Sequence, residues 1–318
     1  MSFHHGLLLK TAAVAVMAWM AGNTAVAQSN AQNFGGGSTI KVDCNKKGSI
    51  GAMLAHLSQI GNTRGVTISV TGTCKENVTI IGFDHLVLQG VSKGTQHSPT
   101  LEDASNGTAA VVFVVNSYDV TLQGFTINGG SPGVGCVQDS FCTLYLNTIQ
   151  QSFSEGVRVA RASAILLNNS ILDNAARGVS AVNGSKLHTI SNTISNNSGG
   201  GGIFVFSDSY VFSENDTIQS NPVGILGQSG SVLRLGGVTI SDNIGDGVRL
   251  ESSSTASFGA NVVTRNGHNG VAIYDLSFAS FNGDNVSGNL GQPDVACYPQ
   301  FSATRGAGTV GGTTNCPN

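Results

Sequence analysis

Apolar residues recur about every 22 to 23 residues through the second half of the chain, each time in a short alternating segment that follows a glycine. The glycines are Gly135, Gly156, Gly178, Gly202, Gly224, Gly247 and Gly270. The residues that directly follow them are Cys136, Val157, Val179, Ile203, Ile225, Val248 and Val271. Alternation with a period of two predicts a β-strand with one buried face, so we expect these residues to point inward.

Two further groups of apolar residues follow within each repeat. The first group comprises Leu144 and Leu146, Ile165 and Leu167, Val211, Leu233 and Leu235, Phe258 and Phe281. The second comprises Ile149, Ile171, Ile194, Ile218, Ile240, Val263 and Val286. Three short strands per repeat predict an all-β parallel solenoid of triangular cross-section. In such a solenoid, neighbouring coils bury the apolar surface that a single coil would leave exposed. Equivalent residues of successive coils then form ladders at the strand spacing of roughly 4.8 Å.

Asparagines form the most regular of these ladders. Asn174, Asn197, Asn221, Asn243, Asn266 and Asn289 occupy nearly the same position after the glycine of each repeat. Asparagine tolerates left-handed backbone, and its amide can bond to the residues above and below it. We therefore expect a structural role in turns, and the same turn accounts for His268.

Both ends of such a solenoid need a cover, because open ends would expose unpaired strand edges and the apolar interior. A helix over residues 49–60 places Ile50, Met53, Leu54, Leu57 and Ile60 on one stripe, and Gly61 follows at the C-cap position. Residues 66–127 read as less regular coils, with an excursion over 92–108. We expect an N-terminal segment with a capping helix at 28–65, the solenoid at 66–292 and a C-terminal cap or tail at 293–318, where the repeat is lost.

The segment 1–27 has the layout of a secretory signal peptide. His4, His5 and Lys10 lead, an apolar run covers 11–21, and the small residues Ala25 to Ala27 form the exit. The apolar run is well under the roughly 20 residues needed to span a bilayer. We expect a mature chain that begins at Gln28, does not insert into the membrane, and is secreted or periplasmic.

Charge and composition narrow the choice of partners. Only 10% of the 318 residues are charged, against about a quarter in typical domains, while glycine contributes 43. Loss of Lys10 with the signal peptide changes the formal net charge from −3 to −4. Neither nucleic acid nor an anionic membrane is therefore predicted as a partner, and we expect a monomer.

Six cysteines lie in the mature part of this exported chain, where disulfides form and persist. They are Cys44, Cys74, Cys136, Cys142, Cys297 and Cys316. Six cysteines allow 15 pairings. Closure of the shortest loops favours pairing each cysteine with its neighbour in sequence, which would staple both ends and one turn.

The coil pattern, together with the segment GTCKENVTI at 72–80, resembles the right-handed parallel β-helix repeat proteins of the pectate-lyase-like superfamily over residues 39–292. This resemblance implies a right-handed solenoid. The superfamily includes pectin and pectate lyases, polygalacturonases, pectinesterases and alginate epimerases, together with members of no known activity. The resemblance therefore implies a polysaccharide partner without specifying a reaction.

The catalytic patterns of these families are missing from the chain. It contains no Asp-Asp doublet of the polygalacturonase kind, no Asp-Pro-His-Asp phrase of the epimerases and no Asp-Phe phrase of the pectinesterases. A calcium-dependent lyase needs several carboxylates around the ion, whereas the expected face holds only Asp139 and Glu251, many coils apart. We expect no metal or cofactor, since only a lyase would need calcium, and catalytic residues and enzyme status stay open.

Two outward-facing patches are not accounted for by the repeat. On the first strand, the substrate-binding candidates are Phe204, Phe206, Arg249, Glu251 and Tyr274. On the second strand, the candidates are Lys186, His188, Tyr210, Phe212 and Arg234. Rings that contact sugar C–H groups beside charged groups that bond hydroxyls are typical of carbohydrate sites. A loop, the C-terminal tail or a partner subunit packed over these rings is the alternative.

We therefore predict an exported β-helix protein that binds or acts on extracellular polysaccharide. One alternative is a polysaccharide lyase or glycoside hydrolase with a site unlike the patterns above. The other is a structural or adhesive cell-surface solenoid without catalysis.

Overall fold

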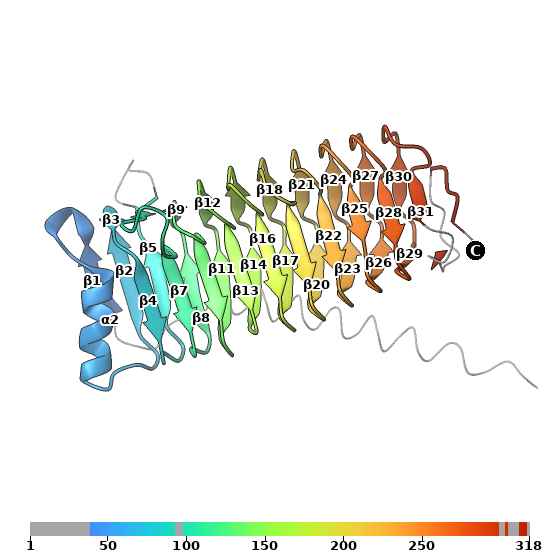
Figure 1. Ribbon diagram of the computed structural model, residues 1–318. Coiled ribbons are helices and arrows are strands. Elements are labelled where there is room, and N and C mark those ends of the chain that lie inside the picture. Colours follow the sequence, from blue (N-terminus) through green and yellow to red (C-terminus); the bar gives the residue numbers. More distant parts are fainter. Residues whose placement is uncertain (1–38, 93–97, 299–302, 305–311, 317–318) are drawn as a thin grey trace, which may run out of the picture. The chain divides into compact units, whose positions relative to one another are not determined.

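The computed structural model describes residues 39–92, 98–298, 303–304 and 312–316, and the predicted signal peptide at 1–27 lies outside these ranges. The described part is a parallel β-solenoid built from three sheets, with strands that add in chain order (Figure 1). One α-helix, α2 (Ile50–Gln59), and one 3-10 helix, η1 (Cys44–Lys46), precede the regular coils. The predicted fold class is confirmed.

Each sheet collects one strand from each complete coil, and the sheet that begins with β1 and ends with β32 has one further strand at each end. The twelve-stranded β1–β32 sheet comprises β1 (Thr39–Asp43), β2 (Thr67–Thr71), β5 (Val87–Gly90), β8 (Val120–Gln123), β11 (Phe141–Tyr145), β14 (Ser163–Leu167), β17 (Lys186–Ile190), β20 (Tyr210–Glu214), β23 (Val232–Gly236), β26 (Thr255–Gly259), β29 (Phe278–Ser280) and β32 (Ala303–Thr304). The ten-stranded β4–β31 sheet comprises β4 (Val78–Ile81), β7 (Val112–Val115), β10 (Val134–Val137), β13 (Val157–Ala160), β16 (Val179–Val182), β19 (Ile203–Phe206), β22 (Ile225–Gln228), β25 (Val248–Leu250), β28 (Val271–Tyr274) and β31 (Val295–Tyr298). The ten-stranded β3–β30 sheet comprises β3 (Thr73–Lys75), β6 (Thr100–Glu102), β9 (Thr126–Asn128), β12 (Thr148–Gln150), β15 (Ser170–Leu172), β18 (Thr193–Ser195), β21 (Thr217–Gln219), β24 (Thr239–Ser241), β27 (Val262–Thr264) and β30 (Asn285–Ser287).

Single residues in left-handed conformation turn the chain from one sheet to the next. In the coil of β13, β14 and β15, Arg161 (φ 50°) and Asn168 (φ 54°) occupy the two short corners. The inward residues of that coil, among them Val157, Leu166 and Ile171, are fully buried. The third-strand residues predicted to point inward, from Ile149 to Val286, are all fully buried as expected.

The predicted register is wrong at β10. Val134 pairs with Val157 and Gly135 pairs with Arg158, so Gly133 rather than Gly135 corresponds to Gly156. A slip of two positions preserves the alternation, so the pattern alone did not distinguish the two glycines. The structure distinguishes the two glycines, because a Cβ at Gly133 would lie 2.8 Å from the Gly156 carbonyl oxygen.

Three second-strand predictions are also wrong. Leu146 is 54% exposed and has a φ of 55°, beyond the end of β11. In β14 the buried residues are Ala164 and Leu166, so Ile165 and Leu167 face outward. The segment Ala-Ile-Leu-Leu is apolar throughout, and it therefore offers no alternation from which to choose a face.

The sheets extend further at both ends than the repeat indicated. Strand β1 pairs with β2 in parallel, and β31 and β32 pair with β28 and β29. Strand β6 likewise lies within the predicted excursion. Among the described residues, no helix is long and apolar enough to cross a bilayer.

Helix α2 lies across the N-terminal end of the solenoid (Figure 1). Ile50, Leu54 and Leu57 are buried in the same cluster as the first coils, whereas Ile60 is 59% exposed at the helix end. Disulfides join Cys44 to Cys74, Cys136 to Cys142 and Cys297 to Cys316. This is the pairing that local loop closure favoured.

The glutamate that follows β3 caps this helix. Glu76 accepts hydrogen bonds from the backbone amides of Ile50 (2.8 Å) and Gly51 (3.0 Å) and from the Ser49 hydroxyl (2.8 Å). A carboxylate at a helix N-terminus satisfies amides that have no partner within the helix and interacts favourably with its dipole.

Glu76→Ala is expected to lower the free energy of unfolding by about 1 to 2 kcal/mol, because it leaves these amides without their acceptor. Glu76→Gln retains one acceptor oxygen and should lose less. Urea denaturation followed by circular dichroism measures both. Equal midpoints for Glu76→Ala and the wild type would contradict this role.

The asparagine ladder is present and runs in one direction. Asn197 Nδ2 donates to Asn221 Oδ1 (3.0 Å) and to the Ile171 carbonyl (3.3 Å), and the other coils repeat this arrangement. A second ladder, not predicted, runs through Asn147, Asn169 and Asn192 at the corner between the second and third strands of each coil. Each asparagine side chain therefore accepts from the asparagine of the coil before it and donates to the asparagine of the coil after it, while it also donates to a backbone carbonyl of the coil before it.

Both ladders end in aspartate. Asn192 donates to Asp216 (2.9 Å), Asn261 to Asp284 (2.8 Å) and Asn289 to Asp294 (3.1 Å). The last residue of a directional ladder needs only to accept from the asparagine before it, and a carboxylate can do so. After Asp216 the ladder position is occupied by a valine, and a new stretch begins at Asn261.

Candidate functional site

The first candidate face is the outer side of the β4–β31 sheet over its last five strands. Parallel register places successive outward residues beside each other, as for Phe206 with Gln228 and Tyr274 with Tyr298. We call Phe206, Gln228, Glu251, Tyr274 and Tyr298 the outer row. It brings together three of the predicted residues and adds Gln228 and Tyr298.

Glu251 links the middle of the outer row. Its carboxylate accepts a hydrogen bond from Gln228 Nε2, and its Oε1 lies 2.5 Å from Arg249 Nε. The Arg249 guanidinium lies over the Tyr274 ring, with 4.8 Å between Cζ and the ring centroid. The rings of Tyr274 and Tyr298 are stacked, with centroids 5.0 Å apart. Both faces of the Tyr274 ring are therefore occupied by protein.

The two predicted phenylalanines form a separate group. Phe204 is only 8% exposed, because the Arg177 guanidinium lies 3.9 Å from its ring centroid and the Phe206 ring is stacked beside it at 5.7 Å. Phe206 is 37% exposed. Of this pair, only Phe206 has a surface available for a ligand.

Asp246 is a further member of this region that the sequence did not single out. It is buried, and burial raises the pKa of its carboxyl, although the Asn269 amide and the charge of Arg249 act in the opposite direction. Burial and the charge of Asp246 also raise the pKa of Tyr274. Asp246 lies in a Gly-Asp-Gly segment, which is typical of a turn, and it was therefore not predicted to be a functional residue.

The repeat pattern did not predict Tyr298, because the pattern is lost before that residue. The sequence contained a signal, since Val295 to Tyr298 reads VACY where Val271 to Tyr274 reads VAIY. The Tyr298 hydroxyl donates to Asn269 Oδ1 at 3.5 Å, and 37% of the residue is exposed.

The arginines on this face and on the strands next to it each lie beside a carboxylate. Arg158 and Arg177 lie 3.6 and 3.7 Å from Glu155 Oε1, and Arg249 pairs with Glu251. The face therefore combines rings and hydrogen-bonding groups with arginines that are each paired with a carboxylate.

The second candidate face is the outer side of the β1–β32 sheet at β17, β20 and β23. The structure brings its predicted residues together, in the order His188, Phe212, Arg234 across three paired strands. The rings of His188 and Phe212 stack with centroids 4.8 Å apart, and Arg234 Cζ lies 5.2 Å from the Phe212 centroid. Lys186 is exposed and Tyr210 is half-buried beside them.

Glu214 belongs to this second patch. Its Oε2 lies 2.6 Å from His188 Nε2, which brings a carboxylate and an imidazole into contact on the surface. Elsewhere in the described ranges, only Cys44, Cys74 and Glu76 bring three potential metal ligands together. Two of these are joined in a disulfide and Glu76 caps α2, so we assign no metal to them.

Comparison with known proteins identifies the fold. A family model described as "Right handed beta helix region" matches residues 155–304. Pectate lyase Pel9A superposes with a TM-score of 0.58 at 12% identity, covering 88% of this chain and 78% of its own. The A-module of the Azotobacter vinelandii mannuronan C-5 epimerase AlgE4 gives 0.51 at 15% identity, with coverages of 81% and 83%. A double mutant of the periplasmic alginate epimerase AlgG gives 0.52 at 12% identity, with coverages of 78% and 73%.

A search among curated proteins finds no match by sequence. Structural likeness at these identities establishes a shared fold, and a shared fold does not by itself carry an activity.

Proposed function

Since this chain is a right-handed parallel β-helix protein, a fold that it shares with proteins named for pectate, mannuronan and alginate, we propose that it is exported and binds polysaccharide along the outer row. The observation that carries the proposal is the outer row itself. The row crosses five neighbouring strands. Aromatic rings lie at its two ends, and amide and carboxylate groups lie between them.

The dimensions of the outer row suit an extended chain. Four strand intervals of roughly 4.8 Å make a length of about 19 Å, enough for several sugar residues side by side. Phe206 and Tyr298, each 37% exposed, offer apolar surface at its two ends. Gln228 and Glu251 offer hydrogen bonds to hydroxyl groups between them.

The charge of the face favours a neutral polysaccharide. Arg249 is engaged by Glu251, and the arginines further along share Glu155. An acidic chain would have to compete with these carboxylates for the guanidinium groups, whereas hydroxyl groups can bond to either partner of a pair.

Phe206→Ala combined with Tyr298→Ala is expected to weaken polysaccharide binding by about tenfold or more, since exposed rings at a contact surface contribute strongly to affinity. Isothermal titration against soluble neutral polysaccharides measures the effect. Phe153→Ala is the matched control, because Phe153 is 63% exposed but lies before β13, outside the five strands of the outer row. Unchanged affinity in the double variant, or no binding by the wild type to any polysaccharide tested, would overturn the proposal in favour of a structural solenoid.

One observation favours an enzyme as the second candidate. Burial raises the pKa of Asp246, which lies near Arg249 and Tyr274, and a carboxyl with a raised pKa near a cation and a phenol is suited to proton transfer. If this candidate is right, the protein releases reducing ends or unsaturated products from a polysaccharide, and Asp246→Asn abolishes that release. Absence of both products from pectin, alginate and neutral glycans, with calcium present, excludes it for those substrates.

A further inference from the structure

The outer face of the β1–β32 sheet has a shallow hollow of about 530 Å³ over β23, β26 and β29. It arises from a change in side-chain size along one row of the sheet. His188, Phe212 and Arg234 are followed in the same register by Ser257 and Ser280. In the neighbouring row, Glu214 is followed by Gly236 and Gly259.

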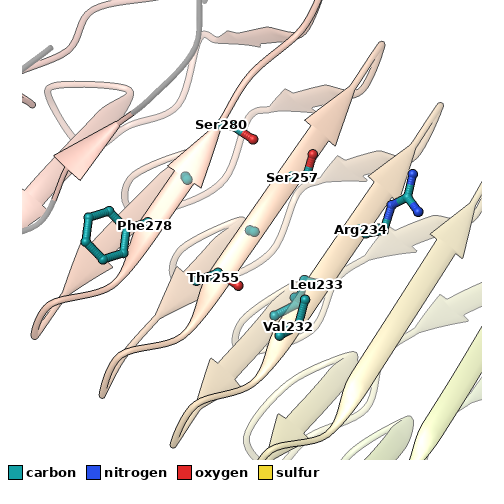
Figure 2. Close-up of a pocket in the computed structure, with 9 residues that line it drawn as sticks. Val232, Leu233, Arg234, Thr255, Ser257, Phe278 and Ser280 are labelled. Carbon is teal, nitrogen blue, oxygen red and sulfur yellow. The ribbon is translucent and has the colours of Figure 1, made fainter. Parts of the chain in front are cut away.

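The hollow has a polar side and a less polar side. Figure 2 shows Arg234, Ser257 and Ser280 in one row across the three strands, and Val232, Thr255 and Phe278 in the other. Val232 and Phe278 are each 40% exposed, although both are large and apolar. A ligand in the hollow would therefore meet a cation and hydroxyl groups along one edge and apolar surface along the other.

Arg234 is held without an anionic partner among the described residues. Its guanidinium is half-buried against the Phe212 ring, whose other neighbour is His188. Glu214 is the carboxylate on the adjacent strand, and it is bound to His188 instead. This arrangement contrasts with the β4–β31 sheet, where each arginine of the candidate face lies beside a carboxylate.

We propose that this hollow binds an acidic sugar residue. Its carboxylate or sulfate group pairs with the Arg234 guanidinium, and its hydroxyl groups bond to Ser257 and Ser280. Its C–H face packs against Phe278 and Val232. The site lies on a different sheet from the outer row and takes a different ligand, so it does not depend on the function proposed above.

The test compares saccharides that differ only in charge, using the full-length protein. Cellotetraose is compared with the tetraglucuronate obtained by oxidising its C6 groups, and dextran is compared with dextran sulfate. The first pair tests for recognition of a carboxylate, and the second pair tests for recognition of a sulfate. Arg234→Gln removes the cation, Ser257→Leu fills the hollow at an exposed position, and Arg265→Gln is a control of equal charge change at the surface.

At least one acidic saccharide is expected to bind, and its affinity should fall by about tenfold or more in Arg234→Gln and in Ser257→Leu. Arg265→Gln and the Phe206→Ala, Tyr298→Ala double variant should bind it as the wild type does. The proposal is overturned if neither acidic saccharide binds, if the neutral partner binds equally well to the Phe206→Ala, Tyr298→Ala double variant, or if Arg234→Gln and Arg265→Gln behave alike. If the double variant loses affinity for the neutral saccharides but still binds the acidic ones, the result concerns the outer row and does not count against this site.

Discussion

Asn243→Asp is expected to destabilise the protein by about 3 to 5 kcal/mol at neutral pH, although the two side chains have the same shape. Asn243 Nδ2 donates to Asn266 Oδ1 (2.9 Å) and to the Ile218 carbonyl (3.2 Å). A carboxylate oxygen in its place would face two acceptors inside a fully formed ladder. Urea denaturation at pH 7 measures the loss.

The same variant should recover part of its stability in acid. Burial and the two facing acceptors would raise the pKa of the new carboxyl, and the protonated group can donate as the amide did. A raised folded-state pKa means that stability is present at low pH and is lost as the pH rises through that pKa. The difference between variant and wild type should therefore be smaller at pH 4 than at pH 7.

Asp216→Asn is the control, because it makes the reverse isosteric change at a ladder end. Asp216 accepts from Ser213 (2.6 Å) and Thr189 (2.5 Å), and hydroxyl groups can turn to accept from an amide. We expect a loss below about 1 kcal/mol. Burial raises the pKa of Asp216 despite these bonds, so the variant also removes a contribution that weakens stability as the pH rises. Equal destabilisation by the two variants would contradict the directional ladder.

Gly224→Ala is the second large effect, with an expected loss of about 2 to 4 kcal/mol or a failure to fold. A Cβ at Gly224 would clash with the Gly247 carbonyl oxygen and would lie 2.6 Å from Ile240 Cγ2. The oxygen belongs to the backbone of the next coil, so relief would require that coil to move. The melting temperature, followed by circular dichroism, should fall accordingly.

Gly259→Ala provides the comparison within the same solenoid. Its nearest neighbour would be the Leu235 carbonyl oxygen at 3.8 Å, which is ordinary contact, and its φ is not positive. We expect a change within about 0.5 kcal/mol. Equal melting temperatures for Gly224→Ala and Gly259→Ala would show that coil packing does not require the glycine.

The repeat was predictable because stacking imposes the same constraint on every coil. Positions such as Gly224 and Asn243 must accommodate or bond to their counterparts above and below, and this leaves the same residue type at a fixed interval. The register of a strand could not be predicted from the sequence where more than one alignment satisfies this constraint. Gly133 and Gly135 both fit the pattern, and the apolar run around Leu166 has no polar positions to mark its outer face.

The outward faces were only partly predictable, for a different reason. Position in the repeat correctly placed Arg249 and Tyr274 on one face, and His188 and Arg234 on another. Which rings remain accessible depends on contacts between side chains of different coils, such as Arg177 over Phe204. Alternation along a strand contains no information on such contacts.

A crystal structure of the protein with an oligosaccharide, taken from the polysaccharide that it binds most tightly, tests the central claim most directly. We expect sugar residues along the outer row, with apolar contacts to Phe206 and Tyr298 and hydrogen bonds to Gln228 or Glu251. An oligosaccharide bound only elsewhere on the solenoid, with the outer row uncovered, would contradict this claim.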